Sequence, residues 1–397
     1  MSGWIGVVGL RLAGSRGWGT LLLGACALGG WLVACEARKT TPAPTADAGP
    51  APTLDAGPDA GLTTPPKLTP SLAAHAELGA GLGNGVALLD PAGRPFLAVA
   101  ARGAGGELFG VDADGKAQRL KTSAKELGGL YALEGQTLAA LDFGGASVVW
   151  IGFEGGALVE RGAVEVGPKP RLLEPHGAQV WALTQDEAHP LVRVERGGQV
   201  LSKVALPGCG PADLELAGQT LWVACVESHE LRGLDPQTGA ERARLPTEPR
   251  PYRVVRDGDL LVVLHTGQAK LSRVDARAAK LVQTQTLPWT PNKVAGGAQG
   301  KAWFLGAGAG RLWLGGAEGQ ELEVPVGSAD AAWLSTPGSL WVVTGDDGRL
   351  LWRKPEASAW DEQAVGFVAG RLLASPQGGG LWVLGPSAGR VARYTVE

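Results

Sequence analysis

The sequence predicts an all-β fold, a β-propeller of four-stranded antiparallel blades, and three observations support this. A short sequence motif, which contains Trp in its clearest copies, recurs at intervals of 38 to 42 residues. Each repeat holds about four short segments of alternating apolar and polar residues, bounded by Gly, Pro and Asp. No stretch of helical periodicity competes with these segments. Repeats of this length that are built from short strands are typical of propeller blades.

The recurring motif is an apolar pair containing Trp, followed by small or apolar residues and a polar loop. Its clearest copies are Leu221-Trp222-Val223-Ala224, Leu340-Trp341-Val342-Val343 and Leu381-Trp382-Val383-Leu384. The aligned positions, including weaker copies, are 97, 139, 181, 222, 261, 303, 341 and 382. We expect the recurring Trp side chains to fill the wedge between neighbouring blades. Trp289 and Trp360 lie outside the motif and are better candidates for contacting a ligand than the Trp residues within it.

The fourth repeat shows the predicted blade best. Strands are expected at residues 213–217, 220–226, 230–234 and 241–245, with turns at Gly218-Gln219 and at residues 235–239. Asp112-Ala113-Asp114-Gly115 occupies the corresponding turn of the first repeat, so we interpret it as a turn and not as a calcium loop.

The repeats resemble known propeller families. The segment Pro211 through Gly239 resembles the bacterial YVTN-type repeats and, more loosely, those of streptogramin lyases and quinoprotein-like propellers. The resemblance covers about residues 80–397 and implies the fold, but this fold hosts many activities. The last repeat has room for only three strands, so a segment around Leu72 to Leu78 is expected to supply the fourth. That gives eight blades, or seven if the weak first repeat is not a full blade.

The first 70 residues predict an export signal and a tether. Arg11 and Arg16 precede an apolar run that ends in Leu32-Val33-Ala34-Cys35, which resembles a bacterial lipobox. We therefore predict a signal peptide at 1–34, lipidation of Cys35, a disordered Pro/Ala/Asp-rich tether at 35–70 and a propeller at 71–397. An ordinary signal peptide or an uncleaved anchor is the alternative. Cys26 is a second lipidation candidate, after a shorter apolar run. Glu36 favours the outer membrane over the inner one, by the same resemblance.

The candidate contact residues lie in loops expected on one face, around the central funnel. His189, His229 and His265 follow the second strand of adjacent repeats, so they are either ordinary loop residues or a metal or acid–base cluster. No nucleotide, hydrolase or metalloprotease motif occurs, and we find no acidic set on several inner strands. The candidates on this rim are Arg171, His189, Glu227, His229, Glu230, Tyr252, His265, Lys270 and Asn292.

The two remaining cysteines, Cys209 and Cys225, stand at the start of one predicted strand and the end of the next. Antiparallel pairing brings those ends together, so we predict a disulfide; two half-buried thiols are the alternative.

The net charge of −3 excludes the strongly basic surface of a dedicated nucleic-acid binder. We expect a monomeric, envelope-anchored binding or scaffold protein with no cofactor and no catalytic residue, whose partner is a protein or a small ligand. The outer-membrane assembly lipoproteins of quinoprotein-like fold are the nearest analogy. A funnel enzyme, such as a lyase, a lactonase or a quinone-dependent dehydrogenase, is the alternative.

Overall fold

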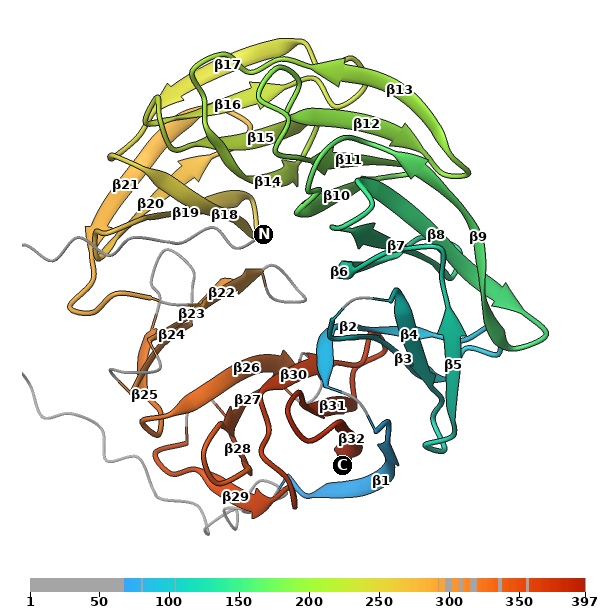
Figure 1. The fold of residues 1–397 in the computed structure, drawn as a ribbon. Helices are drawn as coiled ribbons and strands as arrows, with labels where there is room; N and C mark the ends of the chain where they lie inside the picture. The colour runs from blue at the N-terminus through green and yellow to red at the C-terminus, as the bar shows by residue number, and fades with distance from the viewer. Residues whose placement is uncertain are drawn as a thin grey trace, which may run out of the picture. The chain divides into compact units, whose positions relative to one another are not determined.

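The fold is seen in a computed structural model. It describes residues 68–396 apart from 80, 104, 292, 297–301, 307–309, 315–319, 335–337 and 355–356. These residues form eight four-stranded antiparallel sheets arranged in a ring (Figure 1), which confirms the predicted propeller and the choice of eight blades. In the described part of the chain there is no helix, and therefore none that is long and apolar enough to cross a membrane.

The innermost strand of each blade faces the centre of the ring (Figure 1). Pro211 and Pro251 are the first residues of two of these strands, a position where proline's missing N–H costs no ladder hydrogen bond. The inner strands are β2 (Leu82–Leu89), β6 (Leu127–Leu133), β10 (Leu172–His176), β14 (Pro211–Ala217), β18 (Pro251–Asp257), β22 (Lys293–Gly296), β26 (Ser328–Leu334) and β30 (Arg371–Ala374).

The second and third strands form the buried middle of each blade. The second strands are β3 (Pro95–Ala101), β7 (Thr137–Asp142), β11 (Gln179–Leu183), β15 (Thr220–Cys225), β19 (Leu260–His265), β23 (Ala302–Gly306), β27 (Ser339–Thr344) and β31 (Gly380–Gly385). The third strands are β4 (Glu107–Val111), β8 (Ser147–Glu154), β12 (Leu191–Glu195), β16 (Glu230–Leu234), β20 (Lys270–Asp275), β24 (Arg311–Leu314), β28 (Arg349–Arg353) and β32 (Arg390–Val396).

The outer strands alternate between exposed and partly buried residues, as expected at the rim of a sheet. They are β5 (Ala117–Lys121), β9 (Ala157–Glu165), β13 (Gln199–Val204), β17 (Glu241–Pro246), β21 (Lys280–Thr286), β25 (Gln320–Glu323), β29 (Asp361–Ala364) and β1 (Pro70–Glu77). The four strands expected in the fourth repeat are present within two residues of their predicted ends.

The Trp of the second strand packs against the next blade. Trp181 lies in a cluster with Leu214 and Leu221 of the following blade, and Trp382 lies with Leu97 of the first. Both indoles are almost fully buried. Replacing such a side chain by Ala typically costs about 3–5 kcal/mol, so these positions supply much of the cohesion between blades.

Two repeats are aligned one residue differently from the sequence expectation. Phe96, not Leu97, packs against the second blade, and Val262, not Leu261, packs toward the sixth. Val262 is smaller than Trp, and Trp289 fills the remaining space. Trp289 is 8% exposed, so it is a packing residue and not the ligand contact that its position had suggested.

The ring closes through β1, which pairs antiparallel with β32 from Pro70 opposite Val396 to Glu77 opposite Arg390. The predicted closing segment is thus confirmed. Leu68, just before β1, is buried against the last two blades, and its carbonyl accepts a hydrogen bond of 3.2 Å from the Trp352 indole. Closure therefore covers the edge of β32 and completes the last hydrophobic cluster.

We expect deletion of residues 68–77 to lower the free energy of unfolding by about 3 kcal/mol or more, because Leu68 and the inward side chains of β1 lose their burial. The uncovered β32 edge should also promote association. Chemical denaturation and size-exclusion chromatography measure the two effects. A ten-residue deletion at 46–55, before the propeller, serves as the control; equal behaviour of both deletions would contradict the closing role of β1.

Candidate functional site

The predicted rim residues fall into two groups. Arg171, His189, Glu227, His229 and Glu230 belong to the third and fourth blades. Tyr252, His265 and Lys270 belong to the fifth blade and line a cleft described below. Asn292 and Cys35, like the expected signal and tether, lie outside the described residues.

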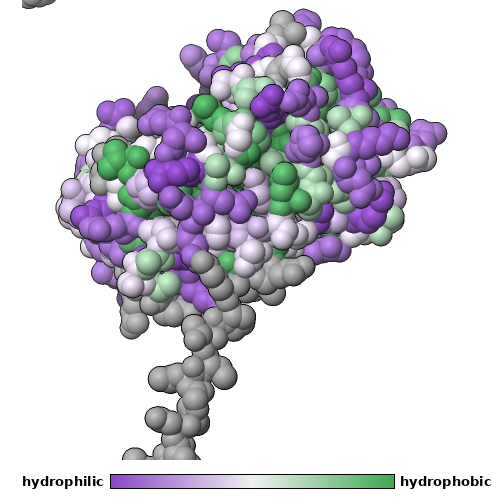
Figure 2. Space-filling model, turned by 90° about the horizontal axis from the view of Figure 1, so that it is seen from below, coloured by the Kyte–Doolittle hydropathy of each residue, from purple (hydrophilic) through white to green (hydrophobic). Residues whose placement is uncertain are grey.

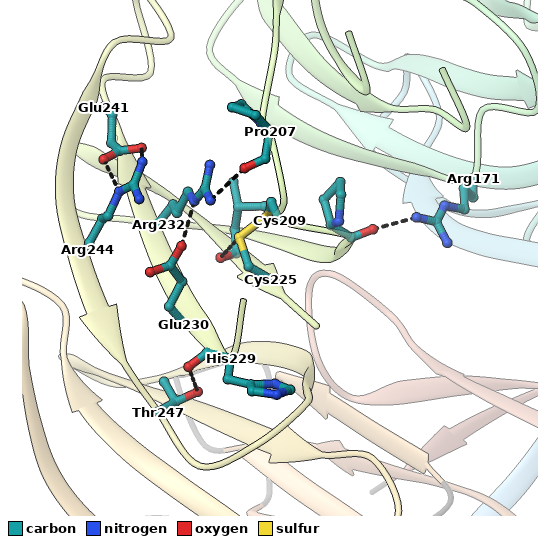
Figure 3. Close-up of a disulfide and its surroundings, with 12 residues drawn as sticks. Arg171, Pro207, Cys209, Cys225, His229, Glu230, Arg232, Glu241, Arg244 and Thr247 are labelled. Carbon is teal, nitrogen blue, oxygen red and sulfur yellow. Dashed lines mark hydrogen bonds and ion pairs between the residues drawn. A yellow bond between two sulfur atoms is a disulfide. The ribbon is translucent and has the colours of Figure 1, made fainter. Parts of the chain in front are cut away.

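The structure contains the predicted disulfide, which joins Cys209, just before β14, to Cys225 at the end of β15 (Figure 3). Both residues are fully buried, and their Cα atoms are 4.5 Å apart. The bond ties the segment that leads into β14 to the loop that follows β15. The Arg171 guanidinium reaches from the preceding blade and donates 2.5 Å to the carbonyl of Pro211.

Glu230 has a structural role, because it forms an ion pair with Arg232. Its carboxylate lies 2.8 Å from the Arg232 guanidinium, which is nearly buried and also donates to the carbonyl of Pro207 (Figure 3). A buried guanidinium needs a counter-charge, because an unpaired one would cost several kcal/mol. Glu230 therefore stabilises the loop beside the disulfide, and its carboxylate is turned away from the His229 ring (Figure 3).

His229 shapes the connection between the fourth and fifth blades. Its backbone has a φ of +57°, and its Nδ1 accepts a hydrogen bond of 3.1 Å from the N–H of Arg250. The carbonyl of Arg250 in turn accepts from the N–H of Thr266, in the loop between β19 and β20. His229 thus acts on the fifth blade through backbone contacts, whereas His189 is exposed in its own loop.

The three histidines do not share an environment. His265 is buried, its Nε2 lies 2.9 Å from the Ser272 hydroxyl, and burial lowers its pKa. Across the described ranges, no three His, Cys, Asp or Glu side chains form a group that could hold a metal ion. The turn Asp112–Gly115 also serves its own backbone: the Asp112 carboxylate accepts from the N–H groups of Asp114 and Lys116.

The described surface has a cleft of about 470 Å³, here called the rim cleft. Its walls are the segment Leu264–Lys270, from the end of β19 to the start of β20, and residues in or just before β18, β22, β26 and β30. Residues of four consecutive blades, the fifth to the eighth, therefore meet at one site. A cavity of this size is in the range of small-ligand sites, or of a few side chains of a partner.

Three basic residues of the rim cleft are paired with carboxylates. Lys270 lies 2.8 Å from Glu248, and this hydrogen bond holds the pKa of Glu248 below its usual value. Lys293 lies 3.4 Å from Asp330, and Arg253 lies 3.4 Å from Asp213. The cationic partner of each pair is partly exposed, so water screens the attraction and the pairs orient these side chains more than they add stability.

The inner strands carry a set of carboxylates that the sequence analysis missed. Glu174 of β10 accepts 2.9 Å from the N–H of Leu216 in β14, and Asp213 of β14 accepts 2.9 Å from Val254 in β18. Asp330 of β26 accepts 3.1 Å from Leu372 in β30. Each carboxylate thus satisfies a backbone donor of the next blade's inner strand. In the sequence, each acidic residue stands about 41 positions before the apolar residue whose N–H it accepts. This spacing equals one repeat, because the two residues lie on the inner strands of neighbouring blades.

Burial raises the pKa of each of these carboxyl groups. The pKa of Glu174 is about 7 and that of Asp213 about 6. The pKa of Glu215, also on β14, is raised to about 8, first by burial and then by the charges of Glu174 and Asp213. The three groups therefore titrate together near neutral pH, and Tyr131 of β6 and Arg256 of β18 flank them.

We expect the protein to be more stable at pH 5 than at pH 8.5. The folded pKa values of Glu174, Asp213 and Glu215 exceed the unfolded ones, so the folded chain binds more protons and stability falls as pH rises between about 5 and 8. Glu215→Gln should flatten this dependence, whereas Glu187→Gln, at an exposed loop position, should not. Thermal unfolding across this pH range measures the effect, and identical slopes for the two variants would refute the role of Glu215.

No family model matches the chain, and no curated protein matches it either. Solved structures do. The Dos1 propeller has a TM-score of 0.65 at 13% identity and covers 82% of this chain and 95% of its own. BamB from Moraxella catarrhalis has a TM-score of 0.61 at 13% identity, with 82% and 100% covered. A streptogramin B lyase has a TM-score of 0.52 at 13% identity, with 68% and 93% covered.

At such low identity these likenesses concern the fold alone. The chain is therefore an eight-bladed β-propeller, closed by its amino-terminal strand and similar in architecture to these three proteins.

Proposed function

We propose that the protein is a lipid-anchored envelope protein whose propeller binds a partner protein or a small ligand without catalysing a reaction. The rim cleft is the observation that carries this proposal, because residues of four blades build it and ion pairs hold three of its basic side chains. Such a fixed, partly apolar hollow suits recognition.

The surface supports contact through a cleft more than through a broad apolar face. On the face shown in Figure 2, hydrophobic residues occur in small groups among hydrophilic ones. Tyr252, at the rim cleft, is 50% exposed, although it is large and aromatic. Tyrosines of this kind often anchor a partner, because the ring is apolar and the hydroxyl can hydrogen-bond.

The anchor is proposed from the amino-terminal sequence. An apolar run ending in Leu32-Val33-Ala34-Cys35 would direct export and lipidation of Cys35. The Pro-rich residues 35–70 would then hold the propeller away from the bilayer. Glu36 supports retention at the outer membrane of a bacterial envelope, by the resemblance to lipoprotein signals.

We expect Cys35→Ser to move the protein from the membrane fraction to the soluble fraction, because a lipidated amino terminus is lost. The matched control is Cys26→Ser, at the second candidate position, which should leave the protein in the membrane fraction. Fractionation with mass spectrometry of the mature amino terminus measures this. Loss of membrane association with Cys26→Ser alone would overturn the assignment of Cys35.

Binding at the rim cleft is tested with a photo-crosslinking residue placed in the full-length protein in its own envelope. A probe at Tyr252 should yield a reproducible adduct, and one at His189, on the rim of the third blade, should not. Tyr252→Ala with Gln268→Ala should reduce partner capture at least tenfold without lowering the melting temperature. Equal adducts at both probe positions, or none at Tyr252, would argue against the proposed site.

A further inference from the structure

The rim cleft contains more basic side chains than carboxylates that can neutralise them. Arg253, Lys270, Lys293 and Arg371 line it. The first three pair with Asp213, Glu248 and Asp330, as described above. Arg371 is the fourth cation, so one positive charge remains after all three pairs are counted.

Arg371 is the first residue of β30, and it is partly buried. The charge of Arg371 helps to lower the pKa of Asp330, against the stronger effect of burial. Asp330 is already engaged with Lys293 and with the N–H of Leu372. Within the described ranges, Arg371 forms no ion pair, so its guanidinium can accept an anion from solution.

A second polar group on the cleft wall also lacks a partner. The hydroxyl of Thr266, in the loop between β19 and β20, is buried and has no hydrogen-bond partner among the described atoms. A buried hydroxyl without a partner is unfavourable, and a hydrogen bond to a ligand oxygen would remove that penalty.

Apolar side chains complete the cleft. Leu264 and Leu372 are 7% and 4% exposed, and Leu373, which also lines the cleft, is partly buried. Tyr252 adds an exposed ring at the same cleft. The site therefore combines one unpaired cation with a hydrophobic floor, which suits an amphipathic monoanion better than a free ion or a dianionic phosphate.

We propose that the rim cleft binds a carboxylate attached to an apolar group, with the Arg371 guanidinium holding the carboxylate and Leu264, Leu373 and Tyr252 contacting the apolar part. Arginine's planar fork matches a carboxylate in a bidentate manner. The inference rests on the proposed binding function of the same cleft. The ligand could be a free carboxylic acid or the carboxy-terminus of a peptide, since both present the same group.

The test is calorimetric titration of the full-length protein with two matched pairs of probes at pH 7. The first pair is N-acetyl-leucine and N-acetyl-leucinamide. The second is the peptide acetyl-Gly-Ser-Gly-Ala-Leu with a free and with an amidated carboxy-terminus. We expect each acid to bind at least tenfold more tightly than its neutral amide, and the tighter of the two acids identifies the source of the ligand.

Arg371→Gln should abolish the preference for the acids, and Arg371→Lys should retain part of it, which separates loss of charge from misfolding. The control is Arg277→Gln, which removes an exposed arginine from the cavity lined by Ala217 and Gly258 and should change nothing. Equal binding of acids and amides, or an unchanged preference in Arg371→Gln, overturns the inference. If Tyr252 still crosslinks to a partner in that case, the binding function stands and only the ligand class is wrong.

Discussion

The structure depends on pairing between the two ends of the propeller, β1 with β32. Without this pairing, the eighth blade would have three strands and the edge of β32 would be exposed. The hydrophobic cluster of the last two blades would also lose Leu68. Because β1 comes from before the first blade, the closing blade is built from residues more than 300 positions apart. Every other blade is a local antiparallel sheet, so closure is the one long-range constraint that all eight share.

Cohesion between blades comes from a different source, the wedge of apolar side chains between sheets. Trp on the second strand fills this wedge in several blades, and where Val262 stands instead, Trp289 enters from the connecting segment. Gly306 permits that arrangement, because a Cβ there would lie 2.5 Å from the Trp289 ring. Residues at different sequence positions thus fill the same space between blades, which explains why Trp289 is buried.

The centre of the ring is held by polar contacts that also shape the candidate site. Glu174, Asp213 and Asp330 each accept a backbone N–H from the next inner strand. Asp213 and Asp330 additionally pair with Arg253 and Lys293 of the rim cleft. The same carboxylates therefore join blades and orient the basic side chains of the cleft, at the cost of burial that raises their pKa values. Arg371, which also lines the cleft, has no such carboxylate partner among the described residues.

The sequence alone determined the fold, the strands of the fourth repeat and the closing strand, because these follow from local alternation and a regular repeat. It also determined the disulfide. Cys209 and Cys225 could be paired since they lie in one hairpin. The cleft could be predicted only in part: Tyr252, His265 and Lys270 line it, but Arg171 and Glu230 instead bind the neighbouring backbone and Arg232. Only the tertiary structure decided which loops meet, since Arg371 and Lys270 come from blades far apart in the chain, and no local pattern encodes how a ring brings them to one cleft.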